Sequence, residues 1–137
     1  MSKWTGYCVA IPVSKPEAMT EDEIQGTISR HRSRNAELRQ VLTANGVSLT
    51  QERPVDVHFW SWDQSDAAAL ARELYRRGYL VTLIARASAE SRDEERWNVE
   101  AGAKIAPQKV LRDEFTEDLV RLASAHDSAY DGWGTAI

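Results

Sequence analysis

Hydrophobic and polar side chains alternate in the segment that follows Pro54, which is the pattern of a strand with one buried face. The hydrophobic set is Val55, Val57 and Phe59, and the alternating set is Asp56, His58 and Trp60. Apolar residues then recur at helical spacing from residue 67 to residue 75, and Gly78 ends the pattern. The chain therefore predicts a strand followed directly by an amphipathic helix.

Strand and helix patterns recur in the rest of the chain. Apolar and β-branched residues predict a strand over residues 79–85, and a third strand crosses residues 97–101 before Pro107. An amphipathic helix is expected over residues 113–126, and a last strand over residues 129–137. The order β-α-β-β-α-β predicts an α+β, ferredoxin-like fold, in which four antiparallel strands carry two helices on one face.

A helical extension is expected before this unit. Thr20 and Glu23 have the spacing of a capping box at a helix start. The apolar pattern weakens over residues 29–34, where we expect either a loosely packed helix or a break, and it resumes over residues 36–45. A short strand is expected over residues 4–13, ended by Pro12 and Pro16. We divide the chain into an N-terminal extension, residues 1–36, and a ferredoxin-like domain, residues 37–137.

A sheet with helices on one face leaves its other face open, and we expect Trp60 and Trp62 on that face. If Val57 and Phe59 face the helices, both tryptophans point outward and form a large aromatic patch. Two explanations stay open at this point. Either residues 1–45 fold over the patch, or a partner protein or a second copy of the chain docks on it.

A second unusual segment lies near the end of the chain, with the sequence Tyr130-Asp131-Gly132-Trp133-Gly134-Thr135. Asp131 and Gly132 are typical of a turn, because glycine tolerates positive φ and aspartate can bond its own backbone. Tyr130 and Trp133 supply large apolar faces that would anchor the tail. We expect an ordered tail whose aromatic side chains either pack against the core or contact a partner.

The composition is that of one globular domain of 137 residues with a net charge of −4. A negative charge argues against indiscriminate binding to nucleic acids. Cys8 is the single cysteine, so an internal disulfide is excluded. No segment approaches the ~20 apolar residues of a membrane-spanning helix. We expect a cytoplasmic protein.

Catalytic and cofactor motifs are missing from the sequence. The histidines at positions 31, 58 and 126 lie in different expected elements without metal-ligand spacing, and no helix follows the tail glycines as in a phosphate-binding loop. Asp56 and Asp131 could perform acid–base chemistry if the first and last strands meet. Such carboxylates more often bond backbone amides at strand ends. We expect no enzyme, no metal and no cofactor.

Direct binding of single-stranded RNA is an alternative. Bases stack on aromatic side chains of the open sheet in RNA-recognition modules, and Trp60 and Trp62 would suit that role. The arginines at positions 30, 32 and 34 could neutralise phosphates. However, no segment has the aromatic signature of those modules, and the net charge is negative. Protein binding is the favoured class, because tryptophan and arginine anchor many protein interfaces.

The order of these motifs resembles the regulator of ribonuclease activity B family, the ribonuclease E inhibitor domain. The resemblance covers roughly residues 37–136, and the hexamer 130–135 is its most specific part. The other segments that carry it are Leu38, Leu42 and Gly46, residues 53–59, Asp66-Ala67-Ala68, Gly78-Tyr79 and Trp97.

This resemblance implies a ferredoxin-like fold and a cytoplasmic protein that binds the endonuclease of bulk messenger-RNA decay. It also implies that binding lowers the cleavage activity of that endonuclease. A protein-binding module unrelated to RNA decay is the alternative. For either role, the residues expected to bind the protein partner are Trp60, Trp62, Tyr130, Asp131 and Trp133.

Overall fold

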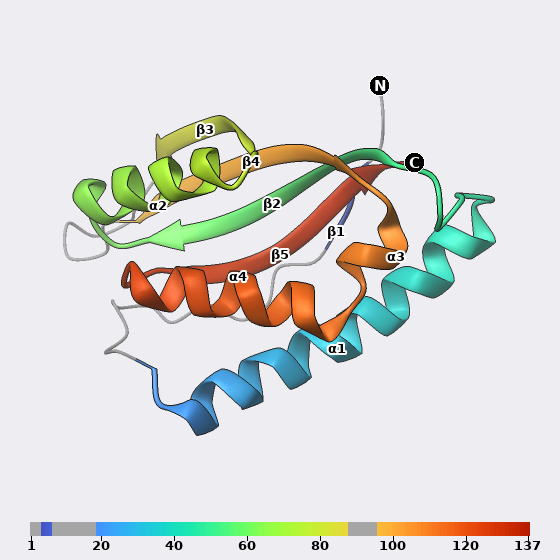
Figure 1. The fold of residues 1–137 in the computed structure, drawn as a ribbon, viewed down its shortest axis with the longest axis horizontal. Helices are drawn as coiled ribbons and strands as arrows, with labels where there is room; N and C mark the ends of the chain where they lie inside the picture. Colours follow the sequence, from blue (N-terminus) through green and yellow to red (C-terminus); the bar gives the residue numbers. More distant parts are fainter. Residues whose placement is uncertain (1–3, 7–18, 88–95) are drawn as a thin grey trace.

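The computed structural model describes residues 4–6, 19–87 and 96–137 (Figure 1). Its elements in chain order are β1 (Trp4–Gly6), α1 (Glu21–Ala44), β2 (Arg53–Ser61), α2 (Gln64–Arg76), β3 (Leu80–Arg86), β4 (Trp97–Ile105), α3 (Pro107–Val110), α4 (Asp113–Ala125) and β5 (Ala129–Ala136). The strands form one antiparallel sheet in the order β1-β5-β2-β4-β3.

From β2 onward the elements follow the predicted order β-α-β-β-α-β, so the α+β, ferredoxin-like fold is confirmed. β2 and β5, the first and last strands of this unit, are neighbours inside the sheet. β1 extends the sheet beyond β5, which agrees with the expected strand over residues 4–6, and the remainder of that prediction, residues 7–13, lies outside the described residues. The single-turn helix α3 is not among the expected elements, since Pro107 is expected only to end a strand. Proline at the first helical position also starts helices.

α1 is one continuous helix of 24 residues, so of the two alternatives for residues 29–34 the helix is present and the break is not. Thr20 is the N-cap as predicted, since its Oγ1 accepts the backbone N–H of Glu23 at 3.2 Å, and its hydroxyl donates to Glu23 Oε1 at 3.1 Å. The predicted boundary between residues 36 and 37 lies inside this helix. One continuous stripe of α1 is buried, made of Ile24, Ile28, His31, Asn35, Leu38 and Leu42.

The three long helices lie on the same side of the sheet, with α1 beside α4 (Figure 1). Two ion pairs join α1 to α4 at the surface, Arg32–Asp113 at 2.9 Å and Arg121–Glu21 at 2.6 Å. The explanation that residues 1–45 cover the open face of the sheet is therefore wrong for α1. Residues 7–18 lie outside the described residues.

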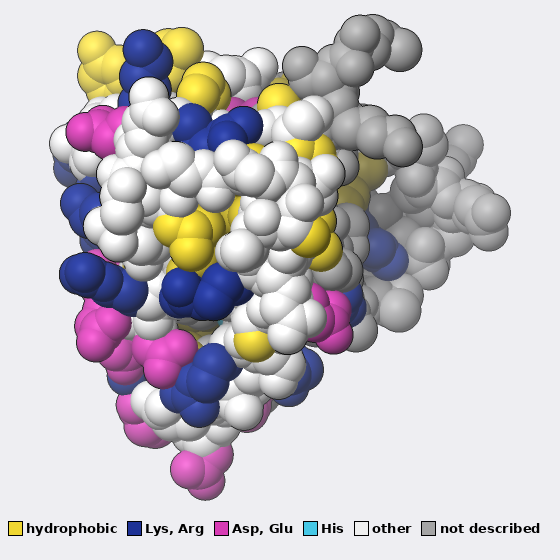
Figure 2. Space-filling model, turned by 90° about the vertical axis from the view of Figure 1, so that its right-hand side faces the viewer, with side chains coloured by type: hydrophobic (Ala, Val, Ile, Leu, Met, Phe, Trp, Pro, Cys, Tyr) yellow, Lys and Arg dark blue, Asp and Glu magenta, His cyan; other side chains and the backbone are white. Residues whose placement is uncertain are grey.

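The hydrophobic core lies between the sheet and these helices. Val55, Val57 and Phe59 are fully buried, as the alternation in β2 predicts, and the buried side chains of α2 and α4 pack over them. Figure 2 shows one end of the molecule, where basic and acidic side chains are interspersed. None of the helices in the described ranges is long and apolar enough to cross a membrane.

Candidate functional site

The expected site residues of the tail lie on β5, in the interior of the sheet. Trp133 is opposite Val57 and Tyr130 is opposite Phe59 in the register with β2. Residues directly opposite each other in an antiparallel pair point to the same face. The two tail aromatics therefore point toward the helices, and they are 2% and 5% exposed. Their burial shows that the tail is docked by its own aromatic side chains.

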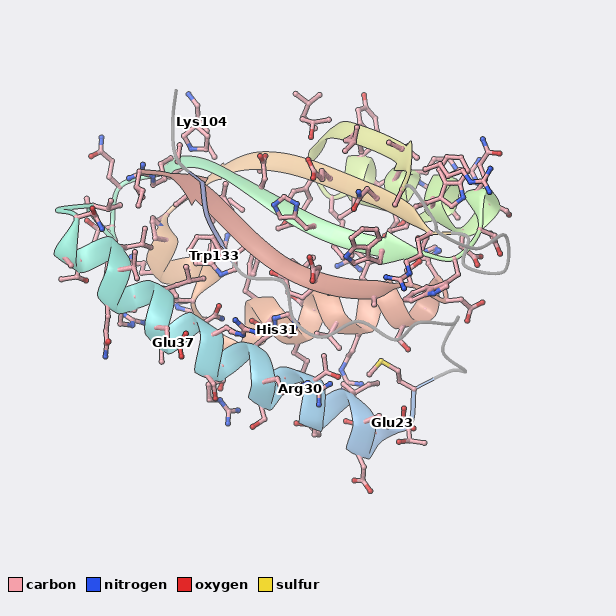
Figure 3. The ribbon with its side chains drawn as sticks, turned by 180° about the vertical axis from the view of Figure 1, so that it is seen from behind. Glu23, Arg30, His31, Glu37, Lys104 and Trp133 are labelled. Atoms are coloured by element: carbon pink, nitrogen blue, oxygen red, sulfur yellow. The ribbon has the colours of Figure 1, made fainter. Side chains whose placement is uncertain are left out.

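A buried chain of hydrogen bonds joins the tail to two helices. The indole N–H of Trp133 donates to Asn35 Oδ1 of α1 at 3.0 Å. The amide nitrogen of Asn35 donates in turn to Thr116 Oγ1 of α4 at 3.3 Å. Figure 3 shows His31 of α1 and Trp133 of β5 between the helix and the sheet. These bonds satisfy the polar atoms of all three side chains inside the core.

His31 stacks on Tyr130 with ring centroids 4.8 Å apart. Burial lowers the pKa of His31 to about 4, a hydrogen bond with the Tyr130 backbone opposes this shift, and Arg30 and Arg34 reinforce it. Burial also raises the pKa of the Tyr130 hydroxyl. Within the described part of the chain, His31 Nε2 and the Tyr130 hydroxyl have no hydrogen-bond partner. Both side chains are therefore neutral at physiological pH.

A β-bulge places Asp131 and Gly132. Gly132 is opposite His58 and Tyr130 is opposite Phe59, so Asp131 is the extra residue of β5. Gly132 has φ of +134°, which other residues rarely adopt. Asp131 itself is buried, at 5% exposure. The Asp-Gly pair therefore forms an irregularity inside a strand, whereas a turn was expected.

The two tryptophans of the expected aromatic patch are separated by the structure. Trp60 is half-buried and points to the other face of the sheet from its neighbour Phe59. Trp62 follows the end of the strand and is only 7% exposed, and within the described ranges its indole N–H has no hydrogen-bond partner. The expectation that both tryptophans point outward is wrong for Trp62, because strand alternation stops at Ser61.

The open face beside Trp60 carries charged groups. His58 Nδ1 lies 3.2 Å from Glu100 Oε1 on the neighbouring strand β4. Burial raises the pKa of Asp56, and Glu100 raises it further while His58 lowers it. A Cβ atom at Gly102 would lie 2.7 Å from Asp56 Oδ1, so the aspartate uses the space above this glycine. Among the described residues, no group of three acidic, histidine or cysteine side chains could hold a metal ion.

Sequence reasoning missed three buried polar residues around the tail, His31, which stacks on Tyr130, and the hydrogen-bonded pair Asn35 and Thr116. A signal for the first two was present in their spacing. The six buried positions of α1 follow one another at alternating intervals of four and three residues, which is the period of one helix face. His31 and Asn35 complete this stripe, but as polar residues they do not appear in the apolar pattern of the helix.

The segments that carry the family resemblance meet in this region. Arg53 donates from Nε to Thr135 Oγ1 at 3.0 Å and from Nη2 to the Ala136 carbonyl oxygen. Thr135 is fully buried and donates to the Pro54 carbonyl oxygen at 2.7 Å. Together with the Trp133 and Tyr130 pairings, these bonds hold β2 against β5. The segment 53–59 and the hexamer 130–135 are thus parts of one structural unit.

Comparison with known protein families gives a match over residues 32–135 to the model described as regulator of ribonuclease activity B. No curated protein matches the chain significantly. The matched residues run from the middle of α1 to the end of β5 and include both segments that meet at Arg53 and Thr135. The description names a regulator of ribonuclease activity. The chain belongs to the regulator of ribonuclease activity B family.

Proposed function

We propose that this protein binds an RNA-degrading endonuclease of the ribonuclease E type in the cytoplasm and inhibits its cleavage of RNA. Membership of the ribonuclease-regulator family is the observation that carries the proposal. Inhibition occurs by protein contact, in a complex of fixed stoichiometry. The buried aromatic side chains and polar bonds of β5 provide a rigid support for such contact.

The contact surface that we propose is the open face around Trp60. A half-buried tryptophan combines a fixed position with apolar area still available to a partner, as in residues that dominate interface energetics. His58 and Glu100 lie beside it and supply polar groups at the rim of the contact. Trp60 is therefore the expected site residue that we assign to direct binding.

The other four expected residues support this surface from within the protein. Trp62, Tyr130, Asp131 and Trp133 are each 7% exposed or less. A partner could reach them only if β5 or the end of β2 moved. We propose that they hold the open face in shape, so that substitutions there affect binding through the fold.

A cleavage assay with purified endonuclease and a fluorogenic single-stranded RNA tests the proposal. Addition of the protein in equal or greater amount should slow cleavage, and Trp60→Ala should remove most of the inhibition while the chain stays folded. Ile137→Ala is the matched control, because Ile137 is an exposed hydrophobic residue, 41% accessible, on the tail. It should inhibit as well as the native chain.

Three outcomes would contradict the proposal. Unchanged cleavage at saturating protein would remove the inhibitor function. Equal inhibition by Trp60→Ala would exclude the open face as the contact surface. Retention of RNA in the absence of the endonuclease, with steep weakening by salt, would instead assign direct RNA binding.

A further inference from the structure

Exposed hydrophobic side chains gather at one edge of the sheet. Five large hydrophobic residues of the described chain are exposed, and four of them belong to β3 or to the adjacent part of α2. Their exposed fractions are 71% for Tyr75, 69% for Leu80, 36% for Leu83 and 44% for Ile84. Figure 1 shows β3 and α2 together at one side of the molecule. We call these four residues the β3-edge cluster.

β3 is an edge strand, because the sheet order places β4 on one side of it and no described strand on the other. An edge strand presents unpaired backbone N–H and C=O groups, and proteins commonly protect such edges with charged side chains or proline. From Leu80 to Ala85 this strand has neither. Its single irregularity is a register shift at Thr82, whose hydroxyl donates to the Glu100 carbonyl oxygen at 3.3 Å. The edge is therefore available for pairing with another strand.

The hydrophobic side chains lie on both faces of this edge. Leu80 and Leu83 are opposite Gly102 and Glu100, on the open face, whereas Ile84 is opposite the buried Val99, on the helical face. An added strand would therefore find apolar neighbours above and below the sheet. This arrangement suits an extended segment with alternating side chains.

The exposed side of α2 next to this edge is basic. Glu73 and Arg77 line a shallow groove between α2 and α4. Arg72 and Tyr75 are three residues apart, and the helical spacing places them on the exposed side of α2 away from that groove. Arg76 is exposed beside them and forms a surface ion pair with Glu73 at 3.7 Å. An exposed tyrosine flanked by arginines borders the β3 edge.

The charge of this region decides between possible occupants. Residues 64–86 contain four arginines and two acidic residues, whereas the whole chain has a net charge of −4. Edge-to-edge pairing with a second copy would place one basic α2 near another, which like-charge repulsion disfavours. An acidic segment would meet a surface of opposite charge, and attraction would also speed its association.

We propose that the β3 edge binds an extended, acidic segment of a partner protein, which adds to the sheet as a sixth strand. Backbone hydrogen bonds along β3 supply affinity, and the β3-edge cluster selects apolar side chains at alternate positions. Arg72 and Arg76 select acidic side chains at the intervening positions of the bound segment. The inference goes beyond the proposed function, because it concerns a different surface from that around Trp60 and does not require the partner to be a ribonuclease.

Selection from a display library of random twelve-residue peptides on the immobilised full chain tests this surface. The enriched peptides should be rich in aspartate and glutamate, with apolar residues at every second position. When the tightest peptide is added to the isotope-labelled chain, amide signals of Leu80–Arg86 should shift. Its affinity should fall as salt is raised.

Substitutions within and outside the edge provide the controls. Ile84→Glu should weaken the peptide about tenfold and Arg72→Glu severalfold, since a tenfold change needs only about 1.4 kcal/mol. Ile137→Glu is the matched control, because Ile137 is 41% exposed and Ile84 is 44% exposed. The affinity of the Ile137→Glu variant for the peptide should stay within about twofold of that of the native chain. All three positions are on the surface, so the variants are expected to fold.

The proposal would be overturned by the absence of enriched peptides, by enrichment of peptides without an acidic bias, or by equal binding to Ile84→Glu. Sedimentation equilibrium of the free chain adds a further test. A dimer that Ile84→Glu converts to a monomer would assign the edge to a second copy. Failure of these tests would leave the Trp60 cleavage assay unaffected, so the two proposals can be separated.

Discussion

Trp133 donates its indole N–H to Asn35 Oδ1 at 3.0 Å, and this bond joins the tail strand β5 to α1 across 98 positions of the sequence. Asn35 also donates to Thr116, so one side chain connects three elements of the core. A buried amide between two partners is costly to remove, because both partners lose their hydrogen bond in a place that water does not reach.

Asn35→Ala should therefore lower the free energy of unfolding by about 2 kcal/mol. Urea unfolding followed by tryptophan fluorescence measures the change. Glu37→Ala, at an exposed position of the same helix, is the control and should stay within about 0.5 kcal/mol of the native chain. Equal stabilities of the two variants would show that the hydrogen-bonded chain contributes nothing to the fold.

Trp133 and Trp60 provide a matched pair, because they lie on neighbouring strands but face opposite sides of the sheet. Trp133→Ala leaves a large cavity in the core and should cost about 3–5 kcal/mol. Trp60→Ala removes a half-buried side chain and should cost about 1–2 kcal/mol. Thermal unfolding of both variants checks the order. A larger loss for Trp60→Ala would mean that the open face contributes more to stability than the helical face.

The central unit of the fold could be predicted from sequence because its strands and helices have clear hydrophobic patterns of period two and of helical period. The burial of β2 shows the predicted alternation, α4 begins and ends within one residue of the expected positions, and α2 begins three residues before the expected apolar pattern. Local patterns of this kind depend on side chains that face one core. The order of strands followed from the order of elements, since ferredoxin-like connections allow few alternatives.

The candidate site could be predicted only in part, because its geometry depends on contacts between distant segments. Trp62 follows the last residue of β2, and no local pattern marks the point where alternation ends. His31 and Asn35 face the core because His31 stacks on Tyr130 and Asn35 accepts the indole N–H of Trp133, and both partners lie nearly one hundred positions away. The burial of a polar residue can be predicted only when its hydrogen-bond or stacking partner is known. The sequence of α1 alone does not identify those partners.

His31 makes the stability of the protein depend on pH. Its pKa is lowered from 6.5 to about 4 in the folded chain, so the unfolded chain binds a proton first as the pH falls. Stability is therefore retained above pH 6.5, and it declines between pH 6.5 and about 4. Over this range the free energy of unfolding falls by about 3 kcal/mol in total.

His31→Phe keeps an aromatic ring beside Tyr130 and removes this titration. Urea unfolding at several pH values should show that the native chain loses about 3 kcal/mol more than the variant between pH 7 and pH 4. Glu21, held at a pKa of about 2 by Arg121, affects stability mainly below this window. Parallel pH profiles for the two proteins would contradict the assignment to His31.

Asp56 and Gly102 face each other on the open side of the sheet, and Ala at position 102 would place Cβ 2.7 Å from Asp56 Oδ1. Gly102→Ala should cost about 1–2 kcal/mol, because the carboxylate must move. In an Asp56→Ala background the same change should be neutral or stabilising, since alanine loses less backbone entropy than glycine on folding.

A double-mutant cycle measured by urea unfolding gives the coupling between the two positions, which should be about 1 kcal/mol or more. Gly46→Ala is the control, because Gly46 has φ of +71° and no atom within 4 Å of an added Cβ. Its cost of about 1 kcal/mol comes from backbone strain and should be the same in both backgrounds. If Gly102→Ala were equally costly with and without Asp56, the backbone of β2 and not the carboxylate would be the obstacle. Glycine would then be required at position 102 by the close approach of the two strands.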